Sequence, residues 1–368
     1  MTSADTRPRT PPPWRGNLVR NSVAQNAWLA QQRPEPPLRP DWPLIDAHQH
    51  LMLAPAHGVV YGLDEALADM AATGQGFVGT VLVEAGTAYD LQAPPSLQPV
   101  GEAHFARDMR TQSLARGGPE LGMALVAHAD LGLGDDVAPV LHALQQASGG
   151  RLRGIRHVTV HDHGAVGRTL LRPCPPGRLL DPDYQAGVAQ VRAMGLVLDV
   201  WVFHHQLHEV LALAQRFDDL IIVLNHLGTP LGVAEHAQDP QATWAQWARG
   251  LQALARCPNV RLKMGGQGMP MAGLGHDHAP CPPDSIALAQ QLQPRWDLAL
   301  EAFGAARCLC TSNFPIDRQS WRLDVIWNTW QRLCLPLSDT ERHALLCGSA
   351  AQTYGLDRSL LSPQPTTS

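Results

Sequence analysis

The sequence lacks the features that mark membrane-spanning, nucleic-acid-binding and disulfide-stabilised proteins. No apolar run approaches the roughly 18 residues that cross a bilayer, Lys and Arg never cluster, and the formal net charge is -5. The seven cysteines form no C-x-x-C pair, and their odd number suits free thiols. The N-terminus has no apolar stretch typical of a signal peptide. We therefore expect a cytoplasmic, globular protein with a small-molecule substrate that binds neither nucleic acid nor membrane.

The sequence also lacks the glycine-rich motifs of nucleotide-binding α/β proteins, since no G-x-G-x-x-G follows an early strand and no P-loop occurs. Apolar runs of strand length instead alternate with segments of helix length. The expected strands are 44–48, 77–83, 121–127, 152–160, 196–202, 220–224, 260–264 and 307–311, and the expected helices are 64–73, 102–116, 136–148, 183–194, 207–217, 241–256, 286–304 and 323–333. Eight such units predict a closed (β/α)8 TIM barrel, with an open doubly wound sheet as the alternative.

Composition divides the chain into three parts. Residues 1–40 are rich in Pro and Arg and form an extended N-terminal arm with one short helix expected near 18–31. Residues 41–357 form the barrel, and 358–368 a C-terminal tail. Tryptophans outside the expected strands suit either a homodimer interface or an anchor for the arm.

The first expected strand ends in Asp46-Ala47-His48-Gln49-His50. Side chains alternate faces along a strand, so His48 and His50 project to the same side. Two neutral imidazoles that converge at a strand end can begin a site for Zn²⁺ or a similar cation, and we predict a metal here. The alternative is a pair of polar side chains in ordinary hydrogen bonds. Two further H-x-H pairs, at 161–163 and 276–278, lie in Gly- and Pro-flanked loops and are expected to be solvated.

Polar residues also follow the other expected strands, at the end where a (β/α)8 barrel builds its active site. They include Glu84, Arg153, Arg156, His204, His226, Lys263, Asn313 and Asp317. Such a series at successive strand ends indicates acid–base or metal chemistry. His226 precedes a Gly turn and is expected at the reacting centre. His204 is a catalytic candidate, whereas the adjacent His205 should point the other way.

Some of these residues leave more than one role open. Glu84 fits a metal ligand, a carboxylate that orients an imidazole, or the ion-pair partner of Arg153 or Arg156. Lys263 fits either a substrate carboxylate or a buried acid. The two arginines are expected to bind a substrate carboxylate, because a guanidinium offers two parallel N–H donors.

Taken together, these stretches resemble the metal-dependent hydrolases of the amidohydrolase superfamily. More narrowly, they resemble the amidohydrolase 2 family, which includes sugar-lactone and dicarboxylate lactonases. The resemblance runs from about residue 22 to 356, and the matching stretches are Asp46-x-His48-x-His50, Gly101 to Phe105, Leu198 to Leu207, Leu224 to Gly232, Cys257 to Gly266, Thr311 to Asp317 and Gly348 to Leu356. It implies a (β/α)8 barrel in which three histidines and an eighth-strand aspartate surround the reacting carbonyl, and the three histidines correspond to His48, His50 and His226.

The chain departs from the lactonase pattern on the eighth strand. Lactonases commonly have Asp before an aromatic-Pro pair, whereas this chain has Asn313-Phe314-Pro315, within a Ser-Asn-Phe-Pro-x-Asp subgroup pattern. The amide of Asn313 cannot accept a proton at neutral pH, so the general base must lie elsewhere. Asp317 is the nearest candidate, and Glu84 and His204 are the others.

We expect a hydrolase that opens a lactone or a related ester or amide. A divalent ion, zinc or manganese, held by His48, His50 and His226, would polarise the carbonyl. Because some lactonases of this family work without metal, His48, His50 and arginines acting directly are the alternative. Arg153, Arg156, Lys263 and Asn313 are expected to contact substrate. A metal-dependent decarboxylase and a non-catalytic ligand-binding barrel are the competing hypotheses.

Overall fold

The computed structural model describes residues 14–53 and 58–357. The tail predicted at 358–368 and the first 13 residues of the predicted arm lie outside this part. Among the described helices, none combines the length and the apolar character needed to span a membrane.

Eight parallel strands form one sheet in the order in which they occur in the sequence. They are β1 (Leu44–Gln49), β2 (Phe77–Val83), β3 (Glu120–Ala127), β4 (Leu152–Arg156), β5 (Val197–Val200), β6 (Ile222–Leu224), β7 (Val260–Lys263) and β8 (Cys308–Leu309). The chain after β8 returns to β1, where the Asn313 N–H donates to the His48 carbonyl at 2.9 Å and the His50 N–H to the Phe314 carbonyl at 2.7 Å. These bonds close the sheet, so the predicted TIM barrel is confirmed.

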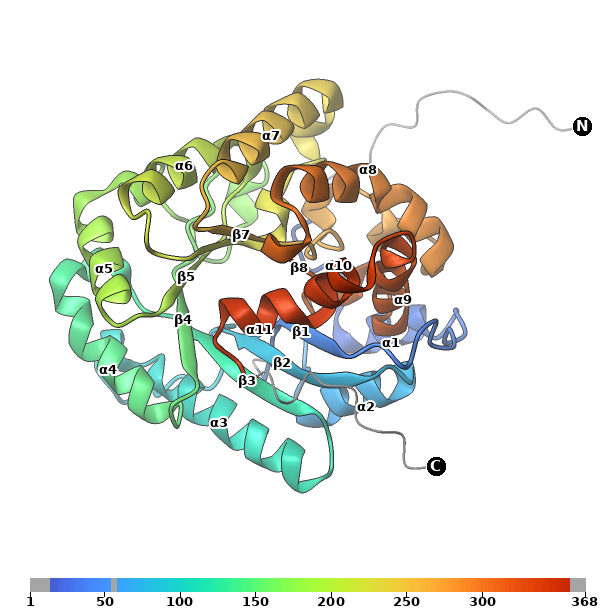
Figure 1. The fold of residues 1–368 in the computed structure, drawn as a ribbon, viewed down its shortest axis with the longest axis horizontal. Coiled ribbons are helices and arrows are strands. Elements are labelled where there is room, and N and C mark those ends of the chain that lie inside the picture. The colour runs from blue at the N-terminus through green and yellow to red at the C-terminus, as the bar shows by residue number, and fades with distance from the viewer. Residues whose placement is uncertain (1–13, 54–57, 358–368) are drawn as a thin grey trace, which may run out of the picture.

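Most of the helices form an outer layer around the strands (Figure 1). In chain order the helices are α1 (Ser22–Leu29), α2 (Leu63–Thr73), α3 (Val100–Ala115), α4 (Ala138–Ala147), α5 (Pro182–Ala193), α6 (Leu207–Arg216), α7 (Pro240–Ala255), α8 (Ser285–Phe303), α9 (Leu323–Cys334), α10 (Asp339–His343) and α11 (Ser349–Thr353). The largest apolar cluster lies between this layer and the outward faces of the strands. Continuous apolar strands are therefore covered on both faces, as a parallel sheet requires.

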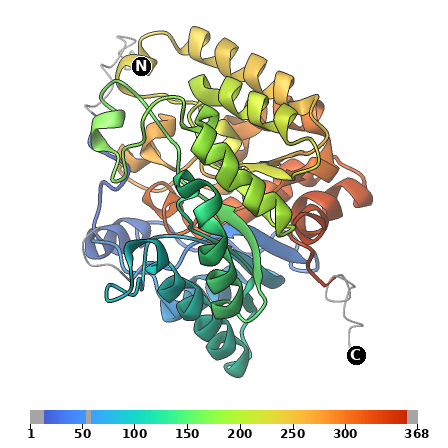
Figure 2. The same cartoon turned by 90° about the vertical axis from the view of Figure 1, so that its left-hand side faces the viewer.

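The amino ends of the strands are closed by the C-terminal segment. Ala350, Ala351 and Tyr354, in and just after α11, pack with inward-facing apolar side chains of the strands. In Figure 2 the red helices near the C-terminus lie on the opposite side of the barrel from the blue N-terminal segment. The carboxyl ends of the strands are consequently the end left for the site.

The N-terminal segment packs closely against the barrel. The Trp14 Nε1–H donates to Thr169 Oγ1 at 2.8 Å, and the Trp28 Nε1–H donates to the Ala279 carbonyl at 2.9 Å. Farther along, the Leu38 N–H donates to Asn328 Oδ1 of α9 at 3.0 Å. The described part of the arm is thus held by long-range hydrogen bonds to the barrel.

Several strands are shorter than predicted at their carboxyl ends. The run expected at 152–160 ends as a strand at Arg156, and the run expected at 196–202 ends at Val200. The sequence stays apolar beyond these points because Val160 and Phe203 belong to a separate apolar cluster that covers this end of the barrel. Hydrophobic periodicity therefore could not locate the strand ends.

Candidate active site

Most of the predicted strand-end side chains meet in one buried group at the centre of the barrel, which we call the central cluster. Its members are His48, His50, Glu84, Arg156, Asp199, Asn225, His226 and Lys263. Six different strands, or the residues directly after them, supply these side chains. Each is less than about one-tenth exposed, so their charges interact in a medium that screens poorly.

The two β1 histidines contact each other and carry a defined hydrogen-bond pattern. The Nε2 atoms of His48 and His50 lie 3.1 Å apart, and His50 Nδ1 lies 2.9 Å from the Val83 carbonyl. Lys263 Nζ lies 3.2 Å from His48 Nδ1. All three contacts are satisfied when Lys263 donates to His48 Nδ1, His48 Nε2–H donates to His50 Nε2, and His50 Nδ1–H donates to Val83. Burial, reinforced by nearby cations, lowers the pKa of His50 to about 4 and places that of His48 well below its usual value.

Two cations in the central cluster are each paired with a carboxylate. The guanidinium of Arg156 donates from Nε to Glu84 Oε1 at 2.9 Å and from Nη2 to the Glu84 carbonyl at 2.8 Å. Lys263 Nζ donates to Asp199 Oδ2 at 2.6 Å, and the Tyr354 hydroxyl donates to Asp199 Oδ1 at 2.9 Å. Burial raises the pKa of Glu84, but Arg156 together with other nearby basic groups outweighs burial, and the net shift is downward. Burial lowers the pKa of Lys263, and Asp199 opposes this change.

His226 follows β6 in an unusual backbone conformation, with φ of 56°. Its ring centroid lies 4.5 Å from that of His48, and its Nδ1 is buried without a hydrogen-bond partner in the described structure. The ring packs on Gly266, where an added Cβ would lie 2.2 Å from Nδ1. A glycine is therefore required at 266 for His226 to face the centre.

After β8, Asn313 and Asp317 form a hydrogen-bonded pair beside the β1 histidines. Asn313 Nδ2 donates to Asp317 Oδ1 at 2.7 Å, and the Gly268 N–H donates to Asp317 Oδ2 at 3.0 Å. Burial outweighs these bonds and raises the pKa of Asp317 to about 7. Asn313 Oδ1 is buried and has no partner in the part of the chain described. Position 313 therefore lacks a carboxylate, but its amide is hydrogen-bonded to the carboxylate of Asp317, whose pKa is near neutrality.

The residues of the central cluster do not fit the predicted zinc or manganese ion in this arrangement. Lys263 contacts one ring nitrogen of His48, and Arg156 Nη1 lies 3.3 Å from the other. The two carboxylates of the central cluster, Glu84 and Asp199, are already paired with cations. Among the described residues, the one set of three or more His, Cys, Asp or Glu donors within 4.8 Å of one another lies elsewhere, at Asp162, His205 and His236.

Two predicted site residues lie away from the central cluster. Arg153 Nη1 donates to the carbonyls of Gly150 and Leu152, on the outer side of the barrel. It is three positions before Arg156, and odd spacing places strand side chains on opposite faces. His204 accepts the Leu231 N–H at 3.3 Å, and its ring lies beside those of His205 and His236.

Asp199 of the central cluster and Tyr354, which donates a hydrogen bond to it, were missed as site residues. Asp199 interrupts an otherwise apolar strand, and a buried acid in such a place needs a partner, which was the available signal. Tyr354 comes from the C-terminal segment, and nothing in its local sequence connects it with β5.

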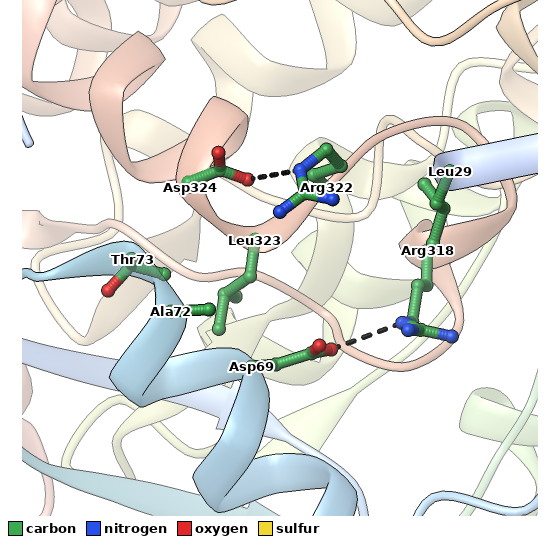
Figure 3. A pocket seen from close by; sticks show the side chains of 8 residues that line it. All are labelled: Leu29, Asp69, Ala72, Thr73, Arg318, Arg322, Leu323 and Asp324. Atoms are coloured by element: carbon green, nitrogen blue, oxygen red, sulfur yellow. Dashed lines mark hydrogen bonds and ion pairs between the residues drawn. The ribbon is translucent and has the colours of Figure 1, made fainter. Parts of the chain in front are cut away.

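Hollows elsewhere in the described structure differ greatly in size. One of about 610 Å³ lies at the rim of the barrel and is lined by residues that include Asp162, His205 and His236. Another, between α2 and the start of α9, holds about 20 Å³ and is flanked by the Arg318–Asp69 and Arg322–Asp324 ion pairs (Figure 3). The latter has room for roughly one water molecule, so it cannot hold a substrate.

Comparison with known proteins adds three findings. An amidohydrolase family model matches residues 45–356. An L-fucono-1,5-lactonase of Burkholderia multivorans is 32% identical over 217 residues, which cover 56% of this chain and 64% of that protein. An uncharacterized protein of Sinorhizobium fredii is 30% identical over 203 residues, which cover 55% of this chain and 60% of that protein. The chain thus spans less than two thirds of the length of these curated relatives.

A solved structure extends the similarity over most of the chain. The crystal structure of an amidohydrolase from Burkholderia multivorans with bound zinc is 25% identical and has a TM-score of 0.60. The match covers 85% of this chain and 99% of that chain.

Proposed function

Because this chain belongs to the amidohydrolase family, we propose that it is a hydrolase that opens a lactone of a small carboxylated or sugar-like molecule. The observation that carries this proposal is the central cluster, which holds neutral imidazoles and cationic donors together at the catalytic end of a barrel. The similarity to an L-fucono-1,5-lactonase supports a cyclic ester as the substrate.

In the proposed reaction, the cations stabilise charge on the carbonyl oxygen. Arg156 Nη1 has only long contacts, 3.4 Å to Asn225 Oδ1 and 3.3 Å to His48 Nε2, so it can turn a hydrogen toward a substrate oxygen. A preorganised donor of this kind in a buried site typically contributes on the order of 10²–10³ in rate. Lys263 fixes the orientation of the His48 ring, because its ammonium contacts the ring nitrogen Nδ1.

Asp317 is the proposed general base. Water attacks the carbonyl carbon, its proton passes to Asp317, and the bond from that carbon to the ring oxygen breaks as the proton is returned to the departing oxygen. A base whose pKa is about 7 is suited to both transfers at neutral pH. His226 Nδ1 and Asn313 Oδ1, which have no hydrogen-bond partner among the described residues, are available to the water and to a substrate hydroxyl.

The test is a screen of sugar lactones and dicarboxylate lactones that records acid release and CO₂ release in parallel. Acid release without CO₂, lost in His48→Ala, is the expected result. Production of CO₂ would instead favour the decarboxylase. Saturable binding without turnover of any substrate would favour a ligand-binding barrel.

A further inference from the structure

A second group of histidines lies at the rim of the barrel, outside the central cluster. Asp162 belongs to the loop after β4, His205 to a short helix after β5 (His204–Gln206), and His236 to a short helix after β6 (Ala234–Ala237). One donor atom from each lies within 4.8 Å of the other two. All three line the hollow of about 610 Å³. We call these three residues the rim site.

Hydrogen bonds through their other atoms already orient the ligand atoms of Asp162 and His205 in the rim site. Asp162 Oδ2 accepts the N–H groups of Gly164 at 2.9 Å and Gly167 at 3.2 Å, which leaves Oδ1 facing His236 Nε2 at 2.9 Å. His205 Nε2 lies 2.8 Å from the His161 carbonyl, so Nε2 carries the hydrogen. The lone pair of His205 is therefore on Nδ1, which is buried and has no partner in the described structure. Metal-binding histidines are commonly fixed in this way by a bond from the other ring nitrogen to a carbonyl.

The electrostatic surroundings of the rim site favour a cation. Glu235 and Asp239 line the same hollow, and neither Lys nor Arg is among its lining residues. The two additional carboxylates attract a divalent ion to the hollow, and no ammonium or guanidinium among the lining residues repels it.

We propose that Asp162 Oδ1, His205 Nδ1 and His236 Nε2 bind a divalent transition-metal ion of the zinc class. The ion displaces the hydrogen that lies between Asp162 Oδ1 and His236 Nε2 in the metal-free protein. Two imidazoles and one carboxylate are a common ligand set for Zn²⁺, and three protein ligands leave a fourth position for water or a small carboxylate. The hollow lies beside the ligands, so this fourth position is open to exchange. This proposal does not depend on the lactonase reaction.

The experiment uses the full chain, stripped with a chelator and dialysed against Zn²⁺ or Co²⁺. Bound metal is counted by plasma mass spectrometry, and Co²⁺ coordination is followed by visible absorption. Asp162→Asn retains an oxygen for the glycine N–H groups, and His236→Ala removes a ring. His142→Ala, an exposed histidine of α4, controls for loss of a surface imidazole, and His48→Ala/His50→Ala controls for the central cluster.

About one ion per chain is expected in the wild type, in His142→Ala and in the central double variant. Each rim variant should bind Zn²⁺ at least about tenfold more weakly and lose the Co²⁺ absorption. Circular dichroism verifies that the variants are folded. Unchanged metal content in both rim variants, or loss confined to the His48/His50 variant, would overturn the proposal, as would absence of metal from every protein.

Discussion

The central cluster and the rim site contain the same type of side chain in opposite electrostatic surroundings. At the centre, His48 lies between Lys263 and Arg156 and is fully enclosed. At the rim, His205 and His236 lie beside Asp162 and open onto a hollow that has no Lys or Arg among its lining residues. Imidazoles next to cations serve as neutral hydrogen-bonding groups, whereas imidazoles next to a carboxylate can bind a metal. The partner charges, more than the H-x-H spacing, decide which chemistry a histidine pair supports.

The largest expected effect separates two arginines of the same strand. Arg156→Ala should lower kcat/KM for lactone hydrolysis by about 10²–10³, because it removes the donor proposed for the carbonyl oxygen. Arg153→Ala should leave kcat/KM within about twofold, because this side chain lies on the outer side of the barrel. Steady-state kinetics on both variants test the difference. An equal decrease of kcat/KM in both variants would show that the face of the strand on which an arginine lies does not decide whether it belongs to the site.

The second prediction concerns the buried Lys263–Asp199 pair. Asp199→Ala should lower the free energy of unfolding by about 3–5 kcal/mol, since it leaves a buried ammonium without its partner. Urea unfolding provides the measurement. Asp219→Ala, which breaks an exposed pair with Arg192, is the matched control and should cause no detectable change. A small loss at position 199 would mean that the centre is less enclosed than its geometry indicates.

The third prediction tests the packing that holds His226 at the centre. Gly266→Ala should destabilise the protein by about 1–3 kcal/mol and reduce activity, because the new Cβ meets the His226 ring. Gly195→Ala is the control, because Gly195 also has a positive φ but an added Cβ there would meet open space. It should show only the backbone cost, about 1 kcal/mol, with activity retained. Thermal unfolding and kinetics of the pair isolate the contact with His226, and equal behaviour would contradict its role.

The fourth prediction concerns pH. Because the pKa of Asp317 is raised to about 7, kcat/KM should increase as pH rises through 7 and the carboxylate forms. Asp317→Asn should remove this limb along with most of the activity. Folding stability changes in the opposite direction, since a raised pKa means that the folded state binds more protons than the unfolded state between about pH 4 and 7. As pH rises over that range, the free energy of unfolding of the wild type should therefore fall relative to that of Asp317→Asn. Parallel plots of unfolding free energy against pH would exclude a buried Asp317 that titrates there.

Most of the fold could be predicted from the sequence because eight apolar runs alternate with helix-length segments. Strand alternation predicted that His48 and His50 lie on the same side of β1. Other contacts could not be predicted, because they depend on where each strand ends and on which distant segment of the chain packs against it. Arg153 was grouped with Arg156 although their spacing places them on opposite faces, and His204 was placed at the centre because the apolar run hid the end of β5 at Val200. The Asp199–Tyr354 bond joins positions 155 residues apart, which no local pattern could reveal.

Activity of metal-stripped enzyme is the most direct test of the contrast between the two histidine sites. We predict that a chelator removes the rim metal while lactone hydrolysis continues at an unchanged rate, and that His48→Ala abolishes hydrolysis whether or not metal is present. Loss of hydrolysis on stripping, restored by zinc and accompanied by loss of bound zinc in His48→Ala/His50→Ala, would contradict the account and place the metal at the central cluster.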